Sequence, residues 1–299
     1  MYHYVRPYNN EYPYFKHLEY NLFIEQLDFL EKKYGFLDPT IPLIDNHNKQ
    51  GVILTFDDGL KDHFDYVLPE LEKRNIKGVF YIPTGHYNTK KMIDVHRIHL
   101  LLGKYGGKVI YSSLKQYVNR EMLTHIDYDD FRNKTYISQG NDNYTAEVKK
   151  TLNYYIDYKY RENVLDMMMA EYLPNENKIY EDFYLSSAEI LGLARSGMLI
   201  GSHSVNHLVM SKISRENQYQ EIAKSFKFIE NLIGKQDIKT FCFPYGGDYS
   251  FTGETEDILN EVGCSYSFNV EPRDVLIEDY ENRPQALPRY DCNMVFDVL

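Results

Sequence analysis

The sequence has no tryptophan and only three cysteines in 299 residues. Cys242, Cys264 and Cys292 are odd in number and far apart, so they match neither a disulfide framework nor a cysteine-based zinc site. A chain with so few and such scattered thiols is best suited to a reducing compartment.

Positive charge and long apolar runs are also scarce. Lys and Arg number 33 against 44 Asp and Glu, a net charge of −11, and no basic run exceeds two residues. Phosphate backbones and anionic membranes are poor partners for such a chain, so we expect no nucleic-acid binding. No window approaches the roughly 20 apolar residues that span a bilayer. Residues 1–7 lack the features of a secretory signal, so we expect a soluble, cytoplasmic protein.

Tyrosine is abundant, with 29 copies. Tyrosine side chains form flat, rigid surfaces that can hydrogen-bond, and such surfaces suit sugars, although a biased base composition in the gene gives the same count. Apolar residues make up 43% of the chain and charged residues 26%, which excludes general disorder. The length allows one large α/β barrel or two ordinary domains.

Short apolar runs that end in polar, Gly or Pro residues recur along the chain, each followed by a helical pattern. This alternation predicts strand-helix units and a largely parallel sheet. Strands are predicted at 52–55, 79–82, 198–201, 240–243, 266–270 and 285–289. Helices are predicted at 60–74, where Pro69 marks a kink or the true start, at 215–233, ended by Gly234, and near 254–262.

Between about 87 and 184 the strand rhythm gives way to helical sequence rich in Tyr and Asn. Intervals of this length are usually functional insertions or lids. We therefore predict one domain over residues 1–299 with a mainly helical insertion at about 87–184. In closed parallel sheets the chemistry lies on the loops after the strands, where the polar clusters of this chain occur.

Asp57 and Asp58 directly follow a predicted buried strand. Two adjacent carboxylates repel each other, and a cation or a difference in protonation relieves that repulsion. A turn that caps the next helix explains an isolated Asp-Asp-Gly segment without any chemistry, and it is the commoner case. Other residues in the chain favour the chemical interpretation.

His203 and His207 follow the end of another predicted strand. Their spacing is predicted to put both imidazoles on one side of a helical turn, close enough to bind one metal ion. Two histidines and one carboxylate leave a coordination position for water, and a second carboxylate beside them can act as its general base. We expect one divalent metal ion, Zn²⁺ by default, with cobalt, nickel or iron also compatible.

Three segments occur in a fixed order: TFDDG at 55–59, HSVNH at 203–207 and FCFPYG at 241–246. They resemble the first three motifs of the polysaccharide deacetylases, the NodB homology family also called carbohydrate esterase family 4. The resemblance covers about residues 50–85 and 186–291 and leaves the middle of the chain outside. It implies an α/β fold, a distorted (β/α) barrel of the NodB type with fewer strands than eight.

The resemblance also implies roles for the site residues. Asp58, His203 and His207 would bind the metal, and Asp57 would be the general base. The metal would polarise the acetyl carbonyl and position a water molecule, whose proton Asp57 would take. A separate acid must then protonate the departing amine.

The same resemblance implies an oxyanion site in the third motif. A backbone N–H near Tyr245, in the turn that also contains Pro244 and Gly246, would help to bind the tetrahedral oxyanion beside the metal. These three residues are therefore the expected oxyanion and substrate contacts.

Two positions depart from the family pattern. Cys242 stands where many members have an arginine that orients the base, and Arg289 stands where many have the acid histidine of a Leu-x-His motif. Arg289 could reach across the strand ends to pair with Asp57 and replace the missing arginine. An ordinary surface ion pair, for example with Asp291, is the alternative.

The missing acid needs a replacement, and His3 is the candidate. Tyr2-His3 resembles a signature near the start of the poly-N-acetylglucosamine deacetylases, where the histidine acts as the acid; a structural histidine is the alternative. His63, His96 and His99 compete for the role. His96 and His99 lie three apart on a predicted helix face, where they could contact substrate or simply be half-buried.

The leading hypothesis is hydrolytic removal of an acetyl group from an N-acetylated sugar, within a saccharide or an intermediate of surface-polysaccharide synthesis. O-deacetylation uses the same machinery and stays open. A second hypothesis is metal-dependent hydrolysis of a non-sugar amide or imide. A third, motivated by Cys242 and Arg289, is a saccharide-binding protein on a decayed enzyme scaffold, against which the retained Asp57, Asp58 and histidines argue. The sequence does not indicate an oligomeric state.

Overall fold

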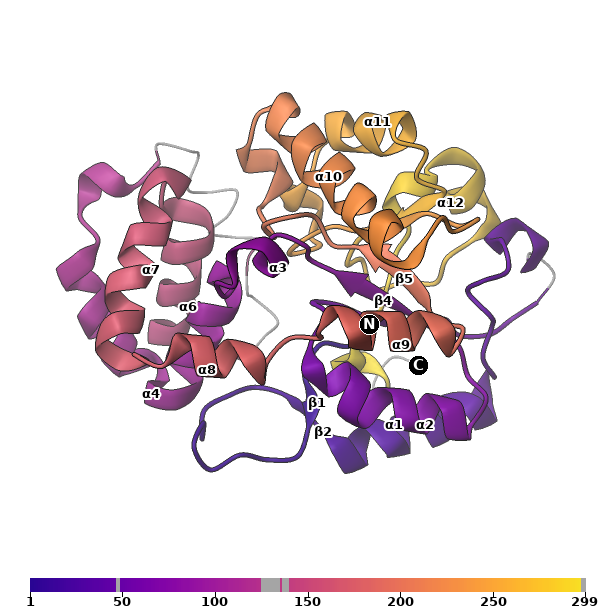
Figure 1. Cartoon of the computed structure of the whole chain (residues 1–299), viewed down its shortest axis with the longest axis horizontal. Helices are drawn as coiled ribbons and strands as arrows, with labels where there is room; N and C mark the ends of the chain where they lie inside the picture. The colour runs from indigo at the N-terminus through magenta and orange to yellow at the C-terminus, as the bar shows by residue number, and fades with distance from the viewer. Residues whose placement is uncertain (47–48, 125–134, 136–139, 297–299) are drawn as a thin grey trace. The chain divides into compact units, whose positions relative to one another are not determined.

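The computed structural model describes residues 1–46, 49–124, 135 and 140–296 (Figure 1). The chain divides into two compact units. Unit 1 consists of Met1–Pro7, His17–Thr89 and Asp182–Leu299, and unit 2 consists of Tyr8–Lys16 and Lys90–Glu181. Unit 2 thus contains most of the stretch at 87–184, together with a short N-terminal segment that the sequence pattern did not assign to it.

The centre of unit 1 is a parallel sheet of five strands in the order β3-β4-β5-β6-β7. These strands are β3 (Leu54–Phe56), β4 (Gly78–Ile82), β5 (Leu199–Ser202), β6 (Thr240–Cys242) and β7 (Tyr266–Phe268). A second, two-stranded parallel sheet pairs β1 (Val5–Arg6) with β2 (Leu18–Glu19). Five of the six predicted strands are therefore present, and all five run in parallel as the strand-helix pattern requires.

The N-terminal segment extends the sheet at the β3 edge. Tyr2 forms a parallel bridge with Phe56, and its N–H donates to the carbonyl of Thr55 at 2.8 Å. The carbonyl of Tyr2 in turn accepts from the N–H of Asp57 at 2.9 Å. Because the bridge is parallel, the residue after Tyr2 lies beside the end of β3.

The C-terminal segment covers the opposite edge, at β7. The prediction of a strand at 285–289 is wrong: Pro284–Ala286 is a 3₁₀ turn, η7, and only Leu287 bridges to Phe268. Pro284 and Pro288 flank this bridge and have no N–H to donate, so the ladder cannot extend beyond one residue. The N–H of Cys292 then donates to the carbonyl of Met1 at 3.1 Å. The two terminal segments therefore meet between the edges of the sheet, and the predicted distorted (β/α) barrel with fewer than eight strands is confirmed.

Helices surround this sheet in unit 1 (Figure 1). They are α1 (Tyr20–Lys33), α2 (Leu68–Lys73), α3 (His86–Thr89), α9 (Ser187–Arg195), α10 (Arg215–Ile233), α11 (Gly253–Glu261) and α12 (Ile277–Asn282). Helix α10 has the predicted bounds: Ser214 caps its N-terminus, and Gly234 ends it with a φ of 84°, which a residue without Cβ adopts readily. The predicted helix at 60–74 contains a π-helical turn, η2 (His63–Val67), directly before α2, so Pro69 lies in the first turn of α2.

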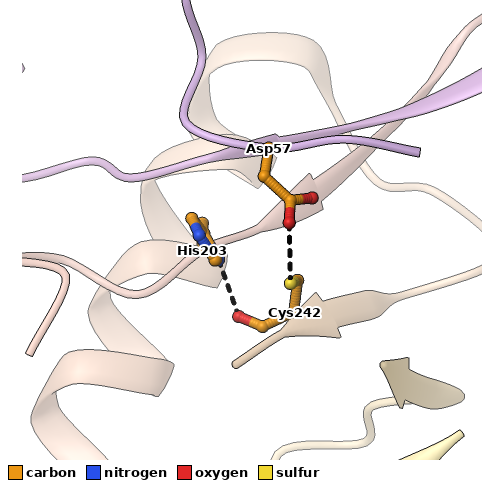
Figure 2. A group of neighbouring side chains, drawn as sticks. All are labelled: Asp57, His203 and Cys242. Carbon is orange, nitrogen blue, oxygen red and sulfur yellow. Dashed lines mark hydrogen bonds between the residues drawn. The ribbon is translucent and has the colours of Figure 1, made fainter. Parts of the chain in front are cut away.

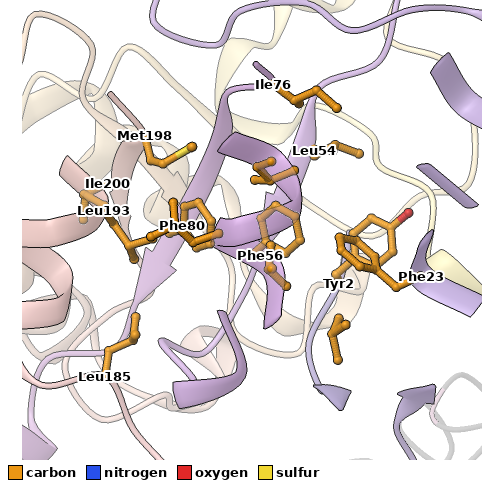
Figure 3. Close-up of a cluster of buried hydrophobic side chains, with 14 of the residues drawn as sticks. Tyr2, Phe23, Leu54, Phe56, Ile76, Phe80, Leu185, Leu193, Met198 and Ile200 are labelled. Carbon is orange, nitrogen blue, oxygen red and sulfur yellow. The ribbon is translucent and has the colours of Figure 1, made fainter. Parts of the chain in front are cut away.

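Alternation along the strands separates two apolar layers. Phe56, Phe80 and Ile200 point to the helices, and Tyr2 and Phe23 pack against the same cluster (Figure 3). The rings of Phe56 and Phe80 stack at 4.8 Å between centroids. The intervening residues form the other layer, inside the barrel: Val79, Tyr81, Leu199, Ile238, Cys242, Tyr266, Phe268 and Leu287. Asp57 follows β3 on the side that faces this inner layer.

Unit 2 is helical in its described part. It contains α4 (Asp94–Tyr117), α6 (Asn143–Lys150), α7 (Tyr158–Tyr172) and α8 (Glu176–Glu181). Arg97 on α4 is 1% exposed, and its guanidinium donates to both carboxylate oxygens of Glu176 at 2.7 and 2.8 Å. This bidentate pair holds α8 against α4. Across the described ranges of both units, we find no helix whose length and apolar character would let it cross a bilayer.

Candidate metal-dependent active site

Asp57 and Asp58 lie at the carboxyl end of β3, and both are buried, at 2% and 3% exposure. Asp58 has a φ of 81°, in the left-handed region, and Gly59 follows with a φ of 60°. This reversal turns the chain sharply as it leaves the strand, which lets the two carboxylates point to different neighbours although they are adjacent in sequence.

His203 directly follows β5, and His207 lies in the loop beyond it. The expectation that both lie on a helical turn is wrong: the segment is an irregular loop in which Ser204 and His207 have φ values of 65° and 54°. The N–H of His207 donates to Ser204 Oγ at 3.0 Å, and the N–H of Ser204 donates to Ser202 Oγ at 3.3 Å. Local hydroxyl acceptors thus replace helical hydrogen bonds, as Ser residues often do in turns.

The ligand atoms of Asp58, His203 and His207 nevertheless converge. Asp58 Oδ1 lies 3.4 Å from His203 Nε2 and 3.4 Å from His207 Nε2. The three ligand atoms lie within 4.8 Å of one another, and all three residues are buried. The rings of the two histidines meet edge to face, with centroids 4.7 Å apart.

The hydrogen bonding of His203 fits a metal ligand. Its Nδ1 lies 2.8 Å from the carbonyl oxygen of Cys242. A carbonyl only accepts, so Nδ1 carries the hydrogen, and in the neutral ring the Nε2 lone pair then faces the oxygen of Asp58. Two facing lone pairs in a buried site require a cation or a proton between them. The donor set of two imidazoles and one carboxylate therefore fits a divalent cation.

The electrostatics around His203 agree with that requirement. Burial alone would lower the pKa of His203, but the neighbouring carboxylates of Asp58 and Asp57 raise it well above its ordinary value. A positive charge at this position is therefore favoured, whether a proton or a metal ion supplies it.

Arg289 is paired with Asp57, which is one of the two alternatives that the sequence left open for this arginine. Arg289 Nη1 donates to Asp57 Oδ1 at 2.9 Å, and Nη2 donates to Oδ2 at 2.8 Å. Arg289 is 6% exposed, and Nη1 also donates to Thr55 Oγ1 at 3.0 Å. Two parallel charge-assisted bonds in a buried site hold the carboxylate in one orientation.

This guanidinium decides the ionisation of Asp57. Burial raises the pKa of Asp57, but the positive charge of Arg289 outweighs that effect and holds the pKa well below its usual range. Burial also raises the pKa of the Cys242 thiol, whose sulfur lies 3.4 Å from Asp57 Oδ2. The thiol therefore stays protonated at neutral pH and donates its hydrogen to the carboxylate.

Asp57, His203 and Cys242 form a second group of possible metal ligands (Figure 2). Figure 2 shows that the carboxylate of Asp57 points to the sulfur of Cys242, while the imidazole of His203 points to its carbonyl oxygen. Arg289 Nη2 lies 2.7 Å from that sulfur and 2.8 Å from Asp57 Oδ2. A protein cation already neutralises this group, so the set with Asp58 is the better metal site.

The side chain of His3 lies close to the carboxylates of both Asp57 and Asp58. Its Nε2 atom is 3.9 Å from Asp57 Oδ2 and 3.9 Å from Asp58 Oδ2, and its side chain is 36% exposed. The bridge of Tyr2 to β3 explains this position, because the next residue along a parallel pair lies beside Asp57. His3 is thus the histidine that reaches both the carboxylates and the solvent.

His63 supports the segment that carries His3. Its Nε2 donates to the carbonyl of His3 at 2.9 Å, and its ring is fully buried against Phe56 and Phe80. Burial lowers the pKa of His63 to about 4, so it is neutral at pH 7. His63 is therefore a buried structural partner, which removes it from the candidates for the acid.

Tyr245 lies in the turn after β6 with a φ of 65°. Its ring meets that of His207 edge to face, with centroids 5.0 Å apart. Gly246 has a φ of 72°, and a Cβ there would approach Val270 Cγ2 to 2.2 Å, so only glycine fits. The carbonyl of Gly246 accepts from the N–H of Val270 at 2.7 Å, and Pro244 is buried. The turn predicted to bind the oxyanion therefore borders the histidine pair.

Left-handed backbone is concentrated at this site. Among the described residues, six residues other than glycine have a positive φ. Four of them, Asp58, Ser204, His207 and Tyr245, belong to the loops just described. Such conformations cost about 1–3 kcal/mol each and persist where the surrounding structure enforces them, often at functional sites.

Glu221 on α10 holds the loop of His207, and the sequence hypotheses did not include it. Its carboxylate accepts from the N–H groups of Val205 and Asn206 at 3.1 and 2.7 Å. The sequence did contain a signal for Glu221, because this residue lies on the apolar stripe of the predicted helix at 215–233. A carboxylate buried there requires hydrogen-bond donors from a neighbouring segment.

His96 and His99 lie on α4 in unit 2. His96 is fully buried, and His99 is partly exposed. Their contact with substrate stays a prediction.

Comparison with known proteins gives a family and a fold. A family model described as polysaccharide deacetylase matches residues 45–122 and 159–267. No curated protein matches the sequence.

Three solved structures are similar to this chain. The Streptococcus pyogenes deacetylase PplD in complex with acetate shares 15% identity over 97% of this chain and 88% of its own, with a TM-score of 0.57. IcaB from Ammonifex degensii shares 16% over 99% and 92%, also with 0.57. A de-N-acetylase from Aggregatibacter actinomycetemcomitans shares 15% over 97% and 92%, with 0.51. At these identities the likeness supports the fold.

Proposed function

The chain belongs to the polysaccharide deacetylase family, and from that premise we propose that it is a metal-dependent hydrolase that removes acetyl groups from N-acetylated sugars. The observation that carries the proposal is the convergence of Asp58, His203 and His207 beside the ionised Asp57. Three buried ligand atoms and one adjacent carboxylate supply a metal position and a base, as metal-assisted hydrolysis of an amide uses them.

Asp58, His203 and His207 would hold one divalent cation, Zn²⁺ first, with cobalt, nickel or iron compatible with the same ligands. When bound, the cation would polarise the acetyl carbonyl and lower the pKa of a water molecule. The bond from His203 Nδ1 to the carbonyl of Cys242 orients the imidazole for this task.

Asp57 is the proposed base. It is ionised because Arg289 lowers its pKa, and the two bonds from the guanidinium fix the plane of the carboxylate. Each carboxylate oxygen keeps further acceptor capacity, so Asp57 can still accept a proton from water at Oδ1 or Oδ2. Arg289 therefore acts by orienting and ionising the base.

His3 is the proposed acid. Its Nε2 atom lies 3.9 Å from the carboxylates of both Asp57 and Asp58, and its side chain reaches solvent. A protonated Nε2 there can pass its proton to the nitrogen of the departing amino sugar and then recover a proton from solvent.

The turn at Tyr245 is the proposed oxyanion site. Its backbone N–H would donate to the oxygen of the tetrahedral intermediate, while Pro244 and Gly246 shape the turn. The contact of the Tyr245 ring with His207 ties this donor to the ligand set.

The two departures from the family pattern do not require a decayed enzyme. Arg289 pairs with Asp57 from the last segment of the chain, where Cys242 leaves room for a guanidinium. His3 supplies an imidazole from the first segment. Both missing groups have a counterpart of the same chemistry in the site, which supports catalysis over sugar binding alone.

The test is release of acetate from a panel of acetylated compounds by metal-free protein and by protein reconstituted with Zn²⁺, Co²⁺, Ni²⁺ or Fe²⁺. We expect turnover of N-acetylated saccharides only after reconstitution. The panel includes O-acetylated sugars and linear and cyclic amides without a sugar. Turnover of those amides alone, or equal turnover by the metal-free protein, would refute the proposal.

A further inference from the structure

Helix α10 carries a buried row of three polar side chains, the polar seam, next to the loop of His203 and His207. Gln218, Glu221 and Ser225 on α10 are 2%, 7% and 0% exposed. They lie three and four positions apart, so they share one face of the helix. Gln218 is hydrogen-bonded to Thr255 on α11 and to the carbonyl of Ile213, whereas Glu221 and Ser225 face the segment that carries the histidines.

Two members of the seam hold opposite ends of the segment that carries the histidines. Ser225 Oγ is hydrogen-bonded to Ser202 Oγ at the end of β5, before His203. Glu221 acts further along, at Val205 and Asn206, before His207. The beginning of the segment therefore has its own anchor, and Glu221 is the anchor of the part that leads to His207.

The carboxylate of Glu221 is hydrogen-bonded to this loop at three points. Glu221 Oε2 accepts from the N–H of Val205 at 3.1 Å and from the N–H of Asn206 at 2.7 Å. Oε1 accepts from Asn206 Nδ2 at 2.6 Å. A buried carboxylate is costly without donors, and three donors from two consecutive residues satisfy this one.

These bonds act on the backbone that sets the position of His207. Ser204 and His207, on either side of the bonded pair, have left-handed φ values of 65° and 54°. One oxygen that accepts from two successive N–H groups fixes both peptide planes, so the chain cannot relax to ordinary backbone angles while the bonds persist. Without them, the loop can move His207 Nε2 away from Asp58.

We propose that Glu221 is a positioning residue that holds His207 at the distance from Asp58 and His203 at which the three can share one divalent cation. The inference rests on the metal site of the proposed function. It goes beyond that function because it assigns the affinity of the site to a residue that contacts neither metal nor substrate.

The experiment compares Zn²⁺ affinity of the metal-free protein with and without Glu221→Gln, by competition with a chromogenic chelator. Glutamine keeps the size of the side chain but carries no charge and offers one acceptor oxygen in place of two. We expect Zn²⁺ binding to weaken about 10- to 100-fold, the range for residues that support a metal ligand. The matched control is Glu230→Gln, an exposed position on the same helix, which should leave the affinity unchanged.

A double variant distinguishes positioning from general stability. If Glu221 acts through His207, then Glu221→Gln should weaken Zn²⁺ binding no further once His207→Ala is present. Thermal unfolding of each metal-free variant is measured alongside. Independent, additive losses of affinity in the double variant would overturn the proposal, and so would wild-type affinity in Glu221→Gln.

Asn206→Ala gives a milder probe if Glu221→Gln does not fold. It removes only the side-chain bond to Glu221 Oε1 and keeps both backbone bonds, so we expect a smaller loss of Zn²⁺ affinity. An unchanged affinity would count against the proposal. Zn²⁺ affinity is measured without substrate, so a wild-type protein that binds Zn²⁺ yet deacetylates no sugar would refute the proposed function and leave this inference standing.

Discussion

Asp57 and Asp58 are adjacent in the chain and almost equally buried, yet the protein treats their charges differently. Both oxygens of Asp57 accept from the guanidinium of Arg289. Asp58 faces the Nε2 atoms of His203 and His207 at 3.4 Å. Asp57 thus has a fixed cation of the protein as its partner, whereas Asp58 lies in a group of ligands that suits an exchangeable cation.

The difference shows how two neighbouring carboxylates can take different tasks. A permanent guanidinium keeps Asp57 ionised and fixed in orientation, as a base requires. The imidazoles of His203 and His207 are neutral when they act as metal ligands, so in the proposed site a cation from solution would balance the charge of Asp58. Changes on the Asp58 side and on the Asp57 side should therefore affect turnover to different extents.

The largest effect is expected at the Asp58 side. Removal of the metal with a chelator should abolish acetate release, and the substitution His203→Ala should abolish acetate release and weaken metal binding, because two ligand atoms hold the ion less tightly than three. Metal content by emission spectroscopy and the acetate assay check this. Full activity in metal-free protein would show that the Asp58 side has no catalytic cation.

At the Asp57 side, Asp57→Asn should keep the metal and reduce turnover by about 10²- to 10⁴-fold, the usual contribution of a general base. Metal content and kcat are measured together. Because the variant leaves Arg289 without its counter-charge, the control is the double variant Asp57→Asn with Arg289→Met, which restores charge balance but not activity. Retained turnover in Asp57→Asn would assign the base elsewhere.

The substitution His3→Gln tests the proposed acid, which lies near both Asp57 and Asp58. For N-acetylated sugars we expect turnover to fall by about 10²-fold, since an amine leaving group needs a proton. For an activated aryl acetate, whose leaving group departs without one, the rate should change little. An equal loss on both substrates would indicate that His3 shapes the site and does not supply the proton.

The smallest effect on turnover is expected from Arg289→Lys, which keeps the charge but cannot form the paired bonds to Asp57. Loss of hydrogen bonds to a buried charged group should lower the free energy of unfolding by about 1.5–3 kcal/mol, measured in urea, while the metal remains bound. A variant that loses the metal would mean that the two sides are not independent.

The sequence was sufficient for much of the fold because local pattern and fold agree there. Strands β3 to β7 are buried runs with turn residues behind them, and α10 has both its N-cap Ser214 and its terminal Gly234. The predicted strand at 285–289 failed because burial alone does not make a strand when prolines flank a single bridging residue.

The sequence also named the chemical groups, Asp57, Asp58, His203 and His207, since residue type and order along parallel strands place them at one edge of the sheet. It misjudged the conformation that brings the histidines together. A four-residue spacing suggests a helical turn, but Ser204, Glu221 and the left-handed backbone create the convergence in a loop.

Only the tertiary structure decided which charged groups of the site are paired with one another. Arg289 lies 232 positions from Asp57, and no local pattern shows that the last segment covers the barrel edge and points its guanidinium inward. His3 reaches the same carboxylates because Tyr2 pairs with β3. Spacing along the chain determines which residues follow a strand, whereas electrostatic balance depends on distances in space, and folding alone sets those.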